Sequence, residues 1–175
     1  MNKLNNIGKL YSLATISSGM TVANSSIPKI ITNRTSNYLR EIINQKLPNI
    51  KKVTMFDLEY RTLPLSEYQE ITEWCYELLK RRLAKDYLKE FYDCDDHAYG
   101  FAYLSLIVFG IPFMRVWGHI YNPATGKWIG GHFWNAMITP DDKFHFYEPI
   151  YNLWGEGEEN IVIGKYKYSS LEVEF

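Results

Sequence analysis

Apolar residues recur with the period of an α-helix in two stretches of the first half of the chain. Residues 36–46 have this pattern and are followed by Pro48, which cannot continue a helix. The second stretch begins at Ser66, a suitable N-cap residue, and extends to about Leu83. Its apolar residues share one helical face: Ile71, Trp74, Cys75, Leu78, Leu79 and Leu83. The sequence therefore predicts two amphipathic helices, with Cys75 as a structural residue in the core.

Residues 94–109 predict a third helix of a different kind. Apolar residues occupy nearly every face of this stretch, which is typical of a helix buried within its domain. Gly110 stands where a left-handed C-cap residue is usual, and Pro112 prevents continuation. We therefore expect a buried helix that ends at Phe109.

The second half of the chain changes to the pattern of β-strands separated by turns. We expect strands at 113–121, 132–138 and 144–148, with an Asn-Pro-Ala-Thr-Gly turn after the first and Thr-Pro-Asp-Asp between the last two. Shorter or weaker strand candidates lie at 160–163, 165–168 and 51–60. Helices followed by antiparallel strands predict an α+β fold, in which the buried helix packs on an antiparallel sheet.

The N-terminal part of the chain differs from the rest. It is rich in Asn, Ser, Thr and Ile and lacks clear periodicity before residue 36, so we predict an N-terminal extension at 1–47, ordered by a protein partner, and one domain at 48–175. Residues 10–23 follow two lysines but contain many Ser, Thr and Gly residues, a poor signal-peptide pattern. We expect no classical signal peptide and no membrane span, and favour the cytoplasm or a larger assembly.

Composition and charge narrow the classes of function. The formal net charge of −1 argues against a nucleic-acid-binding protein held by bulk electrostatics. Aromatic residues make up 16% of the chain, and they either fill the core and sheet faces or line a groove that stacks on peptide or sugar. With two cysteines, no disulfide framework is implied.

Cys94 lies where a helix start can activate a thiol. With Asp93 as the N-cap residue, Cys94 is the first helical residue and Asp96 occupies the third position, as in a capping box. The backbone N–H groups and the positive end of the helix dipole favour a thiolate there and can stabilise an oxyanion. The neighbouring carboxylates oppose ionisation of the thiol, so a cationic histidine partner is required to offset them.

His132 and Glu148 are the expected partners of that thiol. They lie 16 residues apart on consecutive predicted strands, and an even separation places both side chains on one face when they pair directly across a hairpin centred near Pro140. Glu148 could then fix the tautomer of His132 that activates Cys94.

Other acids and histidines compete with this pair less well. Asp141 and Asp142 occupy the turn, at the far end of the hairpin from His132. His145 falls on the opposite face from Glu148, and His97 is expected to be a partly exposed helix residue.

Three blocks of sequence together resemble the transglutaminase-like superfamily of papain-type cysteine enzymes. Residues 93–118 resemble its nucleophile helix and following strand: Cys, an acid two residues on, Ala, a buried helix, Gly-Ile-Pro, and a strand ending in Gly. Residues 131–140 resemble its His-Ala-Trp strand. Tyr-Glu-Pro at 147–149 resembles its Asp-Pro step, with Glu148 in place of Asp. The resemblance covers about residues 93–154 and implies a transglutaminase-like fold.

The resemblance implies a cysteine-dependent acyl-transfer enzyme with Cys94, His132 and Glu148 as the catalytic residues. We expect it to hydrolyse an amide or peptide bond of a peptide or protein substrate, without a metal or cofactor. Trp134 and Asn135 follow His132 and are candidate substrate-binding residues. His119, in mid-strand, is another candidate, with a structural role as the alternative.

Two other interpretations remain open. The fold could serve as a catalytically silent binding or structural module in a larger viral or bacterial assembly. A metal site could be built from the acidic run around Cys94, although neighbouring residues on a helix point apart, so that these side chains cannot all converge.

Overall fold

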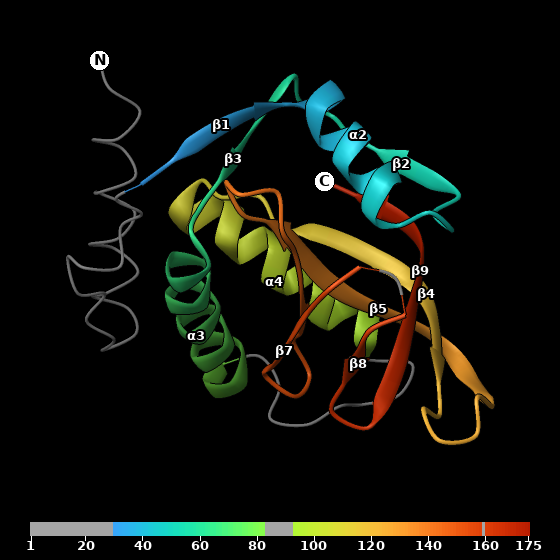
Figure 1. Cartoon of the computed structure of the whole chain (residues 1–175). Coiled ribbons are helices and arrows are strands. Elements are labelled where there is room, and N and C mark those ends of the chain that lie inside the picture. Colours follow the sequence, from blue (N-terminus) through green and yellow to red (C-terminus); the bar gives the residue numbers. More distant parts are fainter. Residues whose placement is uncertain (1–29, 83–92, 159) are drawn as a thin grey trace, which may run out of the picture.

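The computed structural model describes residues 30–82, 93–158 and 160–175 (Figure 1). In these residues it contains three helices, α2 (Ser36–Lys46), α3 (Leu65–Arg82) and α4 (Cys94–Phe109). The strands are β1 (Thr32–Thr35), β2 (Lys52–Thr54), β3 (Glu59–Thr62), β4 (Met114–Tyr121), β5 (Trp128–Ile138), β6 (Phe144–Glu148), β7 (Leu153–Glu156), β8 (Val162–Ile163) and β9 (Tyr166–Glu174). The fold is therefore α+β, as predicted.

The main sheet of the described residues is mixed rather than antiparallel. Its strand order is β2-β9-β4-β5-β6-β7, and β8 pairs with β9. All of its pairs are antiparallel except β2 with β9, which are parallel. The predicted antiparallel sheet is wrong at this edge because β2 comes from the region before the helices and joins the far end of the chain. Strands β1 and β3 form a separate two-stranded sheet.

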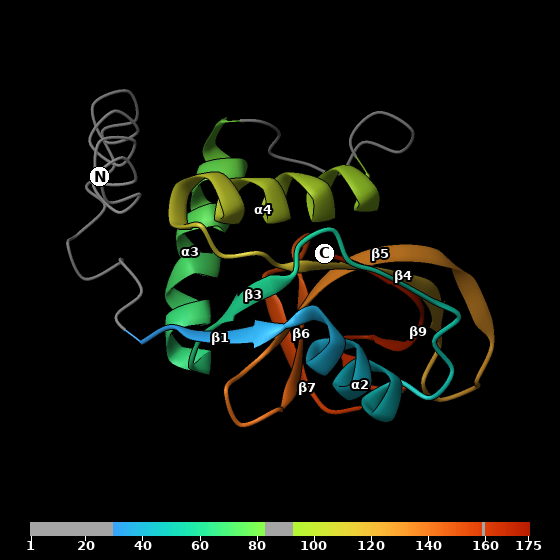
Figure 2. The ribbon, with the colours of Figure 1, turned by 90° about the horizontal axis from the view of Figure 1, so that it is seen from above.

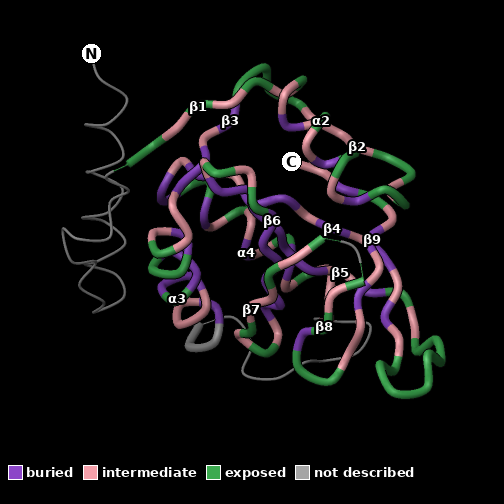
Figure 3. Tube along the Cα trace, viewed as in Figure 1, coloured by how far each residue is buried: buried purple, intermediate pink, exposed green. Residues whose placement is uncertain are grey.

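Helices cover both faces of the main sheet (Figure 2). The face that carries Trp134 and Ala136 packs in one apolar cluster with Leu39 and Ile43 of α2. The other face contributes Met137 and Tyr147 to a second cluster with residues of α3 and α4. Alternation along the strands explains why adjacent residues of β5 serve different clusters. Burial is concentrated on the middle strands, whereas the turn between β4 and β5 is exposed (Figure 3).

Helix α2 and Leu47, the residue after it, pack into the core. Helix α2 has the predicted bounds, with Thr35 as its N-cap residue. Leu39, Ile43 and Leu47 are at most 1% exposed. The predicted extension at 1–47 therefore includes a helix that belongs to the core of the domain, and residues 1–29 lie outside the described residues.

Several element boundaries differ from the prediction. Helix α3 begins at Leu65, and the N–H groups of Glu67 and Tyr68 donate to the carbonyl oxygen of Pro64, so Ser66 is not the N-cap residue. Leu83 lies outside the described residues. The predicted strand at 51–60 is two strands in different sheets, β2 and β3. The sequence pattern also missed β7 and gave β9 too short an extent.

Helix α4 has the predicted bounds but is not buried all round. Its inner face is buried, whereas Tyr103, Leu106 and Ile107 on its outer face are 65%, 52% and 41% exposed. The expectation of a fully buried helix was wrong because, in the described part of the chain, only α3 and the sheet cover it. None of the described helices is long and apolar enough to cross a lipid bilayer.

Candidate active site

Cys94 is the first residue of α4, as its sequence context predicts. Asp93 is the N-cap residue with extended backbone angles, and its N–H donates to Oδ2 of Asp96 at 3.3 Å, one half of a capping box. The first hydrogen bond within the helix runs from the N–H of His97 to the carbonyl oxygen of Asp93, at 3.1 Å. The N–H group of Cys94 comes before the first of these bonds and is therefore one of the donors that have no acceptor within the helix.

The start of α4 is held in position by the sheet beneath it. The amide of Asn135 donates to the carbonyl oxygens of Ala98 and Met114, at 3.0 and 3.3 Å. These bonds tie the second turn of the helix to β4 and β5. At its other end, Gly110 takes the predicted left-handed conformation with a φ of 68°. Both ends of the helix are therefore fixed, which fixes the location of Cys94.

His132 and Glu148 form a buried hydrogen-bonded pair. Nε2 of His132 lies 2.6 Å from Oε2 of Glu148, and the two residues are 8% and 0% exposed. A carboxylate accepts, so Nε2 carries the proton and Nδ1 is left for the thiol. The predicted contact between the two side chains is therefore present.

The strand register that makes this contact differs from the prediction. Asn135 pairs with Tyr147, which centres the hairpin on Asp141 rather than Pro140. Glu148 thus comes to lie diagonally from His132 instead of directly opposite. The predicted direct pairing is wrong, but the shift of two residues keeps both side chains on one face.

Cys94 and His132 meet at the end of β6. The sulfur and the imidazole are within hydrogen-bonding reach, although α4 packs on the face of the sheet opposite to Trp134. The described pairs between β5 and β6 stop at Asn135, so β5 has no β6 partner beside His132. We attribute the contact to this gap, through which the helix start reaches the imidazole.

The charge balance of the site favours a protonated imidazole. Burial of the ring favours its neutral form, but hydrogen bonds to Cys94 and Glu148 and the charges of both groups raise the pKa of His132 to about 9. The imidazolium is therefore the main form at neutral pH. It supplies the cation that the sequence context of Cys94 requires.

Glu148 has two further hydrogen-bond donors, which the sequence did not reveal. The hydroxyl of Tyr168 donates to Oε2 at 2.8 Å, and the N–H of Ile150 donates to Oε1 at 3.1 Å. Tyr168 is 2% exposed and comes from β9, which pairs with β4. Because that pairing joins distant parts of the chain, the sequence gives no signal that would have brought Tyr168 to the site.

Two of the three predicted substrate-binding residues are fully buried. Trp134 and Asn135 are both 0% exposed, Trp134 in the core against the ring of Tyr168 and Asn135 under α4. Neither side chain is accessible to a ligand in this structure. His119 is half-buried on the face of β4 opposite to Val116 and Ile120, with Trp117, Tyr121 and Trp128 as ring neighbours.

The competing residues lie where the sequence places them. Asp141 and Asp142 are in the turn, where they accept hydrogen bonds from Thr139 and Tyr38. His145 is buried beside Thr139, with Nε2 3.4 Å from its hydroxyl. His97 is half-buried on α4; burial lowers its pKa, and the charge of Glu148 opposes that effect.

An acidic pair lies beside the thiol. The carboxyl groups of Asp93 and Asp95 are hydrogen-bonded to each other; this bond, burial and the charge of Asp93 raise the pKa of Asp95. The ligand atoms of Asp93, Cys94 and Asp95 lie within 4.8 Å of one another, closer than expected for neighbouring residues. These three side chains fit a metal site poorly, because the thiol is hydrogen-bonded to His132 and the two carboxyl groups are hydrogen-bonded to each other.

Cys75 has the structural environment that its helix pattern predicts. It is 0% exposed in the apolar cluster between α3 and α4, and burial raises the pKa of its thiol. Both cysteines are free thiols.

Comparison with known proteins adds no relative. Neither the models of protein families nor the curated proteins contain a match to this chain. Any proposal for its function therefore rests on the fold and on the geometry around Cys94.

Proposed function

We propose that this chain has a transglutaminase-like fold and is a cysteine-dependent acyl-transfer enzyme that hydrolyses an amide or peptide bond. The hydrogen-bonded series from Cys94 through His132 to Glu148 carries the proposal. A thiol, an imidazole and a third polar group that orients the imidazole are the arrangement by which cysteine enzymes activate their nucleophile, and Glu148 provides that third group here.

In the first half of the proposed reaction, the thiolate of Cys94 attacks the amide carbonyl carbon and forms a tetrahedral intermediate. The N–H of Cys94 at the start of α4 stabilises the negative oxygen of that intermediate. The carbon–nitrogen bond then breaks, and the imidazolium of His132 gives its Nδ1 proton to the departing amine. An acyl-thioester on Cys94 and a neutral imidazole remain.

In the second half, His132 takes a proton from a water molecule that attacks the thioester. The carbon–sulfur bond breaks, the acid is released, and the thiolate and imidazolium are restored. Glu148 holds Nε2 of His132 throughout and stabilises the positive charge on the ring.

The reactivity of Cys94 toward iodoacetamide tests the proposal. At pH 7 we expect Cys94 to be alkylated at least about tenfold faster than free glutathione, because a thiolate and not a thiol is the nucleophile. Mass spectrometry of digested protein separates Cys94 from Cys75, which should remain unlabelled in the folded protein. His132→Gln is the matched control and should bring the rate at Cys94 down to that of glutathione.

A rate at Cys94 no faster than that of glutathione in the wild-type protein would contradict the proposed enzyme. It would instead favour the silent binding module. The observation that favours that second candidate is the exposed apolar outer face of α4, formed by Tyr103, Leu106 and Ile107.

A further inference from the structure

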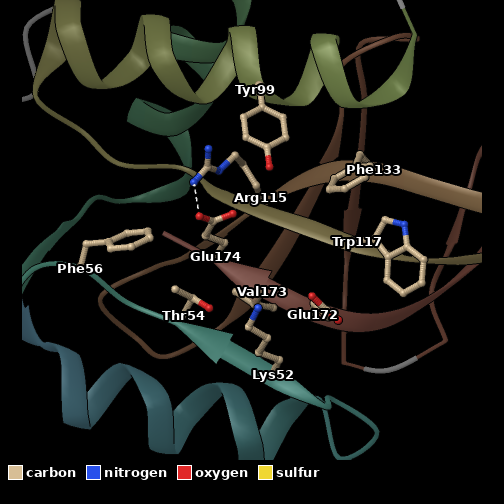
Figure 4. Close-up of a pocket in the computed structure, with 10 residues that line it drawn as sticks. All are labelled: Lys52, Thr54, Phe56, Tyr99, Arg115, Trp117, Phe133, Glu172, Val173 and Glu174. Carbon is tan, nitrogen blue, oxygen red and sulfur yellow. Dashed lines mark ion pairs between the residues drawn. The ribbon is translucent and has the colours of Figure 1, made fainter. Parts of the chain in front are cut away.

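A pocket of about 530 Å³ lies beside α4, on the face of the main sheet that packs against this helix (Figure 4). Its aromatic residues come from four separate segments of the chain: Phe56, Tyr99, Trp117 and Phe133. Strand β9 also lines the pocket, through Glu172, Val173 and Glu174. A volume of this size accepts a ligand of one or two amino acids.

The pocket and Cys94 are connected through α4, which begins with Cys94 and contributes Tyr99 to the pocket. Phe133, one of its walls, directly follows His132 in β5, so its side chain points to the α4 face of the sheet, whereas the His132 side chain lies on the Trp134 face. Trp117 covers Gly131, which directly precedes His132: a Cβ atom at Gly131 would lie 3.7 Å from Nε1 of the indole. Tyr99 follows Cys94 by five residues, which is about 7.5 Å along a helix axis. A group in the pocket therefore lies on the same side of the sheet as the helix that carries Cys94.

Aromatic side chains form the walls of the pocket, and such walls suit a flat apolar ligand. Tyr99 and Phe133 lie with their ring centroids 6.0 Å apart, which joins α4 to β5 across the inner end of the pocket. Phe56, on the opposite side, is 69% exposed and Tyr99 is 41% exposed. Contact of these exposed rings with an aromatic ligand would remove apolar surface from water, which is favourable.

The charged residues of the pocket balance each other. Arg115 forms an ion pair with Glu174 at 2.9 Å, and its guanidinium lies 4.3 Å from the centroid of the Tyr99 ring. Lys52 and Glu172 are register partners on β2 and β9, one of each sign. With two positive and two negative side chains, the pocket has no net charge to attract a charged ligand.

We propose that this aromatic pocket, lined by Phe56, Tyr99, Trp117 and Phe133, binds an uncharged aromatic side chain of the substrate next to the amide that Cys94 attacks. This proposal rests on the proposed function, in which Cys94 attacks an amide of the substrate. The substrate class it assigns is a peptide or amide with an aromatic group close to the bond that breaks.

Two chloroacetamides of the same intrinsic reactivity test the pocket. The probes are 2-chloro-N-methylacetamide and 2-chloro-N-(2-phenylethyl)acetamide, which differ only in the group that the pocket would hold. The second-order rate constant at Cys94 is measured for each probe by mass spectrometry. We expect the phenylethyl probe to react at least about tenfold faster, the factor that 1.4 kcal/mol of binding gives. Matched probes with an ammonium or a carboxylate in place of the phenyl group should lack this advantage.

Variants then locate the effect. Phe56→Ala and Trp117→Leu should each bring the ratio of the two rates down by at least about threefold. Phe56 is well exposed, so its replacement does not depend on tolerance of the core. Trp128→Leu is the control, because Trp128 is 56% exposed and lies outside the pocket, and it should leave the ratio unchanged.

A ratio close to one in the wild-type protein, or a faster reaction with either charged probe, would overturn the proposed pocket. The proposed function is judged separately, from the rate of the methyl probe relative to its rate with glutathione. An unactivated Cys94 would still report the ratio, since chloroacetamides alkylate any accessible thiol. The two proposals can therefore fail independently.

Discussion

The two cysteines of this protein are the same side chain in opposite environments. Cys75 is in the middle of α3, fully buried among apolar residues, where burial raises the pKa of its thiol. Cys94 is the first residue of α4, half-buried and hydrogen-bonded to His132. The comparison shows that position along a helix and one charged neighbour decide whether a thiol is a small apolar residue or a candidate nucleophile.

Acylation of the protein should show the largest difference between the two cysteines. With p-nitrophenyl acetate we expect a burst of p-nitrophenol as an acyl-thioester forms, and Cys94→Ala should lower its rate by at least about 100-fold, since the nucleophile is lost. Stopped-flow absorbance measures the burst. Cys75→Ala is the matched control and should retain it. A burst that survives in Cys94→Ala would show that another group is acylated.

Serine substitution should have the larger effect on stability at Cys75, whereas alanine substitution has the larger effect on acylation at Cys94. Cys75→Ser buries a hydroxyl among apolar side chains and should lower the free energy of unfolding by about 2 kcal/mol. Cys94→Ser, at a half-buried position in the first turn of a helix, should change it by less than about 0.5 kcal/mol. Chemical denaturation followed by tryptophan fluorescence measures both. Equal losses in the two variants would contradict the assignment of Cys75 as the structural cysteine.

The elements around Cys94 could be predicted because their signals are local. Asp93 and Asp96 mark the start of α4 and Gly110 its end, and each signal lies within a few residues of the feature that it determines. His132 and Glu148 could be predicted to lie on one face of the sheet because an even number of residues separates them. Their register could not be predicted, because it depends on the shape of the turn, in which Asp142 adopts a φ of 61°.

The contacts that sequence reasoning missed are between segments far apart in the chain. Strand β9 pairs with β4 on one side and β2 on the other, and this brings Tyr168 to Glu148. The aromatic pocket likewise draws on β2, α4, β4, β5 and β9. Single residues such as Phe56 and Trp117 carry no pattern that predicts a shared cavity. Long-range pairing is determined by the whole fold and has no local signature.

The protonation of His132 provides a direct test of the charged neighbour in this comparison. Its pKa of about 9 predicts that the ring is protonated below that pH and loses its proton as pH rises through it. The imidazole C–H signals in NMR spectra should therefore titrate near pH 9. Cys94→Ala and Glu148→Gln should each move the midpoint to lower pH, because each removes a hydrogen bond that favours the charged ring.

Turnover should follow the same titration. A reaction in which His132 gives a proton to the leaving amine should slow as pH rises above about 9, where the imidazolium is lost. Alkylation of Cys94 needs no such proton, so its rate should not fall over the same range. A wild-type midpoint near that of a free histidine, about 6.5, would contradict the hydrogen-bonded series.

The smallest effect concerns the residue that positions the acid. Tyr168 donates to the same carboxylate oxygen of Glu148 that accepts from His132, so Tyr168→Phe removes one of the donors that hold Glu148 and leaves the ring packed against Trp134. We expect the rate of Cys94 acylation to fall by about threefold and the free energy of unfolding by about 1 kcal/mol.

Tyr38→Phe provides the matched control for Tyr168→Phe, because the Tyr38 hydroxyl also donates to a carboxylate, that of Asp142 in the distant turn. It should alter stability by a similar or smaller amount and leave the midpoint of the His132 titration near pH 9. Tyr168→Phe should move that midpoint, because the hydroxyl shares the oxygen that His132 uses. If both variants leave the midpoint in place, Tyr168 is a structural residue, and Glu148 is held without it.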